Sequence, residues 1–161
     1  MKTVNSLSGG KTSSYIAANY PADYNVFALV RTENKNCMFP DKKVRQTVSD
    51  KIGKEFIGTL EQDAIIKIVL ELEQFTGKKI DWVSGLTFEE VVKLPQNNLL
   101  PSPLRRYCTE HLKVVPIFDW WNKNINEVVE MRIGFRANEM RRANNMKKKL
   151  VNGLFGIKHI I

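Results

Sequence analysis

The chain has 161 residues, of which 43% are apolar and 26% charged, and its 25 lysines and arginines against 17 acidic residues give a formal net charge of +8. This composition is typical of a globular protein, and the length predicts a single domain that buries its own core. No apolar run reaches the roughly 18–20 residues of a membrane span, and the N-terminus turns polar and glycine-rich too early for a secretory signal.

Short apolar runs alternate with helical stretches along the chain, which is the pattern of an α/β protein. We expect strands at residues 2–7, 25–31, 55–57 and 128–135. We expect helices at residues 12–20, 41–54, 61–75, 87–93 and 109–122, with a proline-rich loop over residues 94–104. The third helix has an apolar stripe formed by Ile65, Ile66, Val69, Leu72 and Phe75.

The most informative segment joins the first strand to the first helix and reads Ser8-Gly9-Gly10-Lys11-Thr12-Ser13. Adjacent glycines let the backbone turn tightly and approach a ligand closely. The unpaired amides at the helix N-terminus then form an anion site, to which the hydroxyl groups and Lys11 add donors and charge. We call residues 8–13 the glycine loop.

Three interpretations of the glycine loop compete. Gly10-Lys11-Thr12 matches the end of a Walker A motif, but Asn5 stands where that motif requires its first glycine. A plain turn with serine and threonine caps is the second interpretation. The third is a pyrophosphate-binding loop of another family.

Two later segments favour the third interpretation. Residues 106–116 read RYCTEHLKVVP, and residues 134–142 read GFRANEMRR. Together with the glycine loop they resemble three motifs of the PP-loop superfamily, which occur there in the same order. The glycine loop resembles Ser-Gly-Gly-x-Asp-Ser. Residues 106–116 resemble Arg-x-Cys-Thr-x-x-Leu-Lys-x-x-Pro, and residues 134–142 resemble Gly-[Ile/Phe]-Arg-Ala-Asp-Glu-x-x-Arg. The chain is most similar to the phosphoadenosine phosphosulfate (PAPS) reductase-like branch of the superfamily. The resemblance spans residues 1–143 and implies an open, mostly parallel sheet with helices on both faces.

The resemblance also implies an adenine-nucleotide ligand, ATP or PAPS, and cleavage between the α and β phosphates with pyrophosphate release. It assigns nucleotide or phosphate binding to Ser8, Gly9, Gly10, Lys11, Thr12, Ser13, Val30, Thr32, Arg106, Lys113, Arg136, Arg141 and Arg142. The edge at Val30 and Thr32 would line adenine and ribose mainly through its backbone. No catalytic residue is assigned, and Glu33 and Asp41 are the nearest candidates for a general base.

The sequence departs from the family where catalysis is concerned. The only cysteines are Cys37 and Cys108, so the C-terminal redox cysteine of PAPS reductases is absent, and no cluster or zinc site can be completed. Thr12 and Asn138 replace two aspartates, which weakens the case for Mg²⁺ without excluding it. So few cysteines favour a reducing cytoplasm.

These departures leave two alternatives open. The chain is then either an inactive nucleotide- or anion-binding protein, of the kind found in phages and mobile elements, or a nucleic-acid-modifying protein. The second alternative depends on a basic C-terminal region that contains Arg141, Arg142 and Lys147-Lys148-Lys149. Homo-oligomers are compatible with either alternative.

Overall fold

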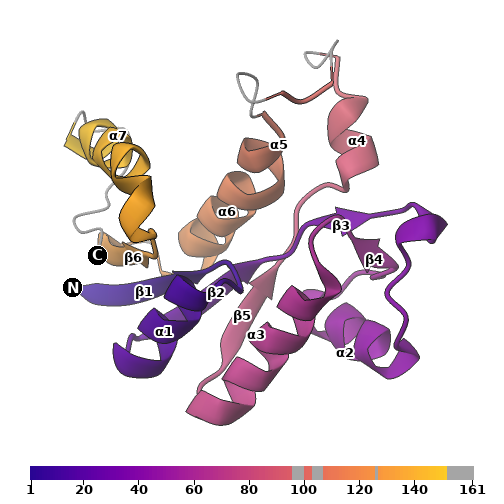
Figure 1. Cartoon of the computed structure of the whole chain (residues 1–161), viewed down its shortest axis with the longest axis horizontal. Helices are drawn as coiled ribbons and strands as arrows, with labels where there is room; N and C mark the ends of the chain where they lie inside the picture. The colour runs from indigo at the N-terminus through magenta and orange to yellow at the C-terminus, as the bar shows by residue number, and fades with distance from the viewer. Residues whose placement is uncertain (96–99, 103–106, 126, 152–161) are drawn as a thin grey trace. The chain divides into compact units, whose positions relative to one another are not determined.

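The central feature of the fold is a parallel sheet (Figure 1). The structure is a computed structural model, and it describes residues 1–95, 100–102, 107–125 and 127–151. In the described residues the strands of the sheet are β1 (Lys2–Leu7), β2 (Tyr24–Ala28), β5 (Ile80–Val83) and β6 (Val129–Ile133), in the order β5-β2-β1-β6. Asn5 of β1 lies between Asn25 of β2 and Arg132 of β6. An open α/β architecture with a parallel sheet flanked by helices is therefore confirmed.

The chain divides into two compact units. Unit 1 comprises Met1–Phe27, Ile65–Asp81 and Asn126–Ile161, and unit 2 comprises Ala28–Ala64 and Trp82–Ile125. The chain passes from one unit to the other within β2 and again within β5.

Unit 1 contains the glycine loop and four helical elements. They are α1 (Lys11–Asn19), nearly all of α3 (Asp63–Thr76), the 3₁₀ turn η3 (Ala137–Glu139) and α7 (Met140–Val151). Its core combines apolar side chains from the strands, α1 and α3, namely Val4, Leu7, Ile16, Ala17, Val26, Phe27, Ile66, Val69, Leu72, Val129 and Met131. These contacts supply most of the burial that stabilises the unit.

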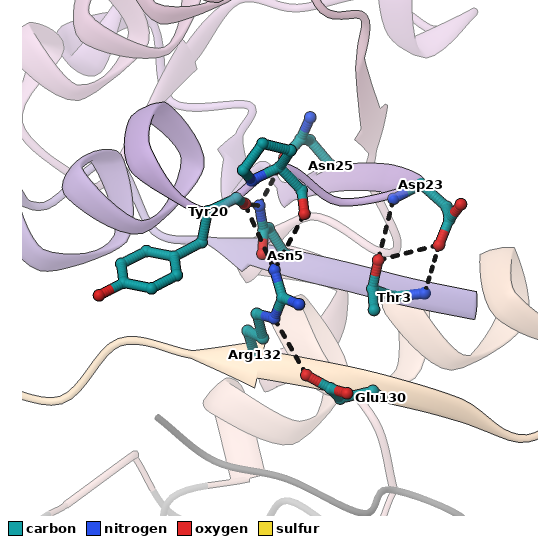
Figure 2. Close-up of polar contacts among 8 residues, drawn as sticks. Thr3, Asn5, Tyr20, Asp23, Asn25, Glu130 and Arg132 are labelled. Carbon is teal, nitrogen blue, oxygen red and sulfur yellow. Dashed lines mark hydrogen bonds and ion pairs between the residues drawn. The ribbon is translucent and has the colours of Figure 1, made fainter. Parts of the chain in front are cut away.

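Polar contacts also cross the sheet of unit 1, as Figure 2 shows. The buried Asn5 donates through Nδ2 to Tyr20 O at 3.0 Å and to Asn25 Oδ1 at 3.1 Å. Arg132 Nη1 donates to Pro21 O at 3.1 Å, and Arg132 Nε pairs with Glu130 Oε1 at 3.1 Å. Asn5 and Arg132 therefore satisfy carbonyls just after α1 and fix the C-terminal end of that helix against the sheet.

Unit 2 begins with the ends of β2 and β5 and adds a small antiparallel pair, β3 (Arg31–Thr32) and β4 (Gly58–Thr59). Its remaining elements are η1 (Lys35–Cys37), α2 (Lys42–Ile52), α4 (Phe88–Val92), α5 (Tyr107–Thr109), the π-helical turn η2 (Glu110–Val114) and α6 (Val115–Asn124). Phe39 and Phe56 pack with ring centroids 6.1 Å apart, and Val30, Val91 and Leu112 form a second buried cluster.

Helix ends with strong local signals are confirmed. Asp41 caps α2 by accepting from Lys43 N at 2.8 Å, and Gly53 ends that helix with a φ of 64°. Thr87 and Glu90 form a capping box at the start of α4. These side chains act within one helical turn, so the sequence alone is sufficient to predict them.

Several sequence-based expectations are wrong. The strand expected over residues 25–31 ends at Ala28, and β3 starts only at Arg31; the strand expected over residues 55–57 lies instead at Gly58–Thr59. Phe75 is 81% exposed although it continues the apolar stripe of α3. The sequence reading also missed β5, η3 and α7.

Candidate functional site

Gly9 forms the tight turn of the glycine loop. Its φ is +69°, a left-handed conformation that side-chain-bearing residues rarely adopt. A β carbon at residue 9 would lie 2.5 Å from Ile65 Cγ2 and 3.3 Å from Val69 Cγ2 of α3. Glycine is therefore required here both for the backbone conformation and for the close contact with α3.

Ser13 holds the two ends of the glycine loop together. Its buried hydroxyl donates to Gly10 O at 3.0 Å and accepts from Ser8 N at 3.2 Å, and it lies 3.1 Å from Ser8 Oγ. A hydroxyl has a single proton, so Ser8 Oγ is the donor to Ser13. The Ser13 side chain is thus engaged inside the loop, and its contribution to a phosphate would come from its backbone amide.

Gly10 leaves the mouth of the loop open. It occupies the N-cap position of α1 with extended backbone angles and, as a glycine, has no side chain to cap the helix. Among the described residues a β carbon at Gly10 would approach only Ser8 Oγ, at 3.5 Å. Lys11 is exposed beside it and Thr12 is half-buried. The first backbone amides of α1 can therefore donate hydrogen bonds to an anion, and the helix dipole favours negative charge at this end of the helix.

The segment after β6 begins directly against this loop. A β carbon at Gly134 would lie 3.0 Å from Ser13 N and 3.1 Å from Thr12 Cγ2. The structure therefore brings together two segments that the sequence reading assigned to phosphate binding, although more than a hundred residues separate them. We call residues 134–142 the arginine segment.

Glu139 organises the arginines of this segment. Its carboxylate accepts from Arg136 N at 3.1 Å, from Arg136 Nε at 3.3 Å and from Arg142 Nη1 at 3.0 Å. The Arg136 amide and the two guanidinium groups lower the pKa of Glu139 to about 2. The Arg142 guanidinium also lies 5.7 Å from the Phe135 ring centroid.

The arginines still present charge to solvent. The side chains of Arg136 and Arg142 are 72% and 58% exposed, and Arg141 is exposed as well. The basic residues Lys147, Lys148 and Lys149 fall in α7, but their side chains lie outside the described ones. Unit 1 thus combines an open helix N-terminus with oriented guanidinium groups on its arginine segment.

In unit 2, the side chains of Val30 and Thr32 are buried and contact other side chains of the protein. Val30 is buried against Val91 and Leu112, and the buried Thr32 hydroxyl bonds to Glu89 Oε1. Glu89 Oε2 also accepts from Glu33 N at 3.0 Å. Burial raises the pKa of Glu89, but the hydrogen bonds from Thr32 and Glu33 outweigh it, so the net shift is downward. A ligand at this strand end would meet backbone groups, as the resemblance implies.

Lys113 of η2 pairs with Glu61, and both side chains are half-buried. Arg106, its expected partner in anion binding, lies outside the described residues. Cys108 is half-buried against the Val30 cluster.

The two candidates for a general base have other contacts. Asp41 Oδ1 caps α2, and Glu33 Oε1 lies 3.5 Å from Thr87 Oγ1. In the part of the chain that the structure describes, no cluster of three or more His, Cys, Asp or Glu residues could hold a metal ion.

Sequence reasoning missed the long-range contacts that organise these segments. Glu61 and Glu89 hold Lys113 and Thr32, and Arg31 Nε donates to Ser84 Oγ at 2.6 Å and Arg31 Nη2 to Gly85 O at 2.9 Å. Each contact joins residues more than fifty positions apart. No local motif could have indicated them.

Comparison with models of known protein families, with curated proteins and with solved structures found no match. Among the described residues, the helices are all too short or too polar to cross a membrane.

Proposed function

We propose that the chain binds an adenine nucleotide, ATP or PAPS, with its phosphates on the glycine loop. The observation that carries this proposal is the open N-terminus of α1 at Gly10, where a β carbon would approach only Ser8 Oγ among the described residues. Backbone amides at such a helix end bind phosphate oxygens. The contact of Gly134 with the first turn of α1 supports the proposal, because it joins two of the three segments on which the PP-loop resemblance depends.

Arg136, Arg141 and Arg142 fit the same role. Guanidinium groups bind phosphate or sulfate oxygens in a fork, and Glu139 orients two of the three through its two carboxylate oxygens. With ATP as the ligand, the reaction that follows is adenylation of an acceptor: the acceptor forms a bond to the α phosphorus, the bond between the α phosphorus and the α–β bridging oxygen breaks, and pyrophosphate leaves. Positioning and neutralisation of the developing charge would accelerate this step. The proposal does not include conventional sulfonucleotide reduction, because neither Cys37 nor Cys108 stands in the sequence context of the redox cysteine of PAPS reductases.

Calorimetric titration with ATP, with and without Mg²⁺, tests this proposal in the wild type and in Gly10→Val. The backbone angles of Gly10 suit a β-branched residue, so the variant should fold, as circular dichroism would verify. Its side chain fills the mouth of the loop, and we expect at least a hundredfold loss of ATP affinity. The control is Ala18→Val, a similar change at an exposed position of α1. ATP binding that is unchanged in Gly10→Val would refute the assignment of the loop.

A nucleotide-binding protein without catalytic activity is the second candidate. Its support is that Asp41 caps a helix and that Thr12 and Asn138 stand where the family has carboxylates. Release of pyrophosphate from ATP distinguishes the two candidates. Binding without release across amine, carboxylate and RNA acceptors would favour the second. For the RNA acceptor, affinity should fall steeply with salt if the basic C-terminal region binds the phosphate backbone.

A further inference from the structure

Glu61 and Lys113 form an ion pair that joins residues 52 positions apart within unit 2. The two side chains are only 21% and 34% exposed, respectively. A pair of this kind is partly shielded from water and from salt. Each charge therefore depends on its partner more than a charge in an exposed ion pair does.

Lys113 has a fixed position. It belongs to the π-helical turn η2, between Leu112, which is buried in the Val30 cluster, and Pro116, which is buried at the start of α6. A β carbon at Gly85 would lie 2.7 Å from Pro116 Cγ and 3.1 Å from His111 O, so η2 packs closely on the loop after β5. The backbone that carries Lys113 therefore has little freedom to move.

Glu61 is less completely satisfied. Its amide donates to the buried Thr59 Oγ1 at 3.1 Å, which fixes its backbone just after β4. One carboxylate oxygen, Oε1, contacts Lys113 Nζ. The other, Oε2, is buried and has no hydrogen-bond partner among the described residues. A buried carboxylate oxygen without a donor is unfavourable, and the cost is removed when the side chain rotates into water.

We propose that Glu61 is an internal counter-ion that competes with an anionic ligand for Lys113. This inference rests on the proposed nucleotide-binding function and on the anion-binding role that the PP-loop resemblance assigns to Lys113. A sulfate or phosphate group carries more charge than one carboxylate and brings several acceptor oxygens. Its binding to Lys113 displaces Glu61, whose unpaired oxygen then gains hydration. Lys113 is thus neutralised in the free protein and selects ligands with enough charge to displace the carboxylate.

The test uses inorganic sulfate at constant ionic strength and measures the rise in Tm with sulfate concentration. Without sulfate, Glu61→Gln should have a lower Tm than the wild type, because Lys113 has lost its partner. Half-maximal stabilisation should then occur at about two- to tenfold lower sulfate concentration than in the wild type. In Glu61→Gln/Lys113→Met this gain should vanish. Glu127→Gln, which removes the partner of Lys2 from an exposed pair, is the matched control for net charge and should respond like the wild type.

Equal sulfate responses in Glu61→Gln and the wild type would overturn the proposal, and so would a gain that persists without Lys113. If Glu61→Gln does not fold, the carboxyl ¹³C signal of Glu61 in the wild type serves instead. It should shift on addition of sulfate, and a static signal at saturation counts against the proposal. Failure of the proposed function is recognised separately, as an absence of ATP binding by the wild type whatever the sulfate response.

Discussion

Gly134 and Ser13 are in contact: a β carbon on Gly134 would lie 3.0 Å from the amide nitrogen of Ser13. Two of the three nearest atoms, Ser13 N and Thr12 C, are backbone atoms in the first turn of α1, and the third is Thr12 Cγ2. The contact therefore cannot be relieved by rotation of a long, flexible side chain. The end of β6 thereby determines the space available to the glycine loop. A residue remote in sequence controls the geometry of the proposed phosphate site.

Gly134→Ala should displace the first turn of α1. We expect a loss of about 1–2 kcal/mol in the free energy of unfolding, since overpacking at a tight contact has this cost. ATP affinity should fall as well, because the loop amides move. Urea denaturation and calorimetry measure the two effects. Gly10→Ala is the stability control, since its β carbon fits at 3.5 Å from Ser8 Oγ; equal stability losses in both variants would contradict the argument.

Gly9 and Gly53 offer a matched comparison, because their φ angles are +69° and +64°. Alanine at either position should cost about 1–2 kcal/mol for the left-handed backbone. Only Gly9→Ala also overlaps Ile65 Cγ2, at 2.5 Å, whereas among the described residues Gly53 has no atom within 4 Å of its added carbon. We expect Gly9→Ala to be less stable than Gly53→Ala by a further 1–3 kcal/mol, roughly. Similar denaturation midpoints would show that the contact with α3 is unimportant.

The carboxylate of Glu139 should titrate far below an ordinary glutamate. Its pKa in the folded protein is about 2, against 4.5 for the unperturbed group. A lowered pKa means that this stabilisation is complete above pH 4.5 and is lost as the pH falls toward 2. Carboxyl ¹³C chemical shifts measure this pKa directly. Arg136→Ala and Arg142→Ala should each raise it, and a value near 4.5 in the wild type would contradict the contacts described.

The sequence predictions succeeded where an element depends on contacts between residues close together in the chain, and failed where it depends on contacts between distant residues. Asp41 and Thr87 were identified as helix starts because their side chains bond amides two or three residues away. The break between β2 and β3 was not predicted, since Leu29 and Val30 are both buried and continue the apolar run without interruption. Phe75 fits the helical period of the stripe on α3 but lies one turn beyond its buried part.

For the glycine loop too, some features could be predicted from the sequence and others could not. Its glycines, its position before α1 and its family resemblance were apparent from the sequence, whereas the engagement of the Ser13 hydroxyl within the loop was not. Asn5, which excluded a Walker A motif, is a buried residue that bonds across the sheet to Asn25 and to Tyr20 O. Such roles depend on pairing between strands, which the chain's local pattern does not specify.

The most direct test of the central claim is an ATP titration followed by ¹H–¹⁵N NMR of the backbone amides. The account predicts that the signals of Lys11, Thr12 and Ser13 shift most and saturate together, since their amides would bind the phosphates. It also predicts that these shifts are lost in Gly10→Val, while the signals of β1 and α3 remain dispersed. Loop amides that stay unshifted at saturating ATP, or no binding at all, would contradict it.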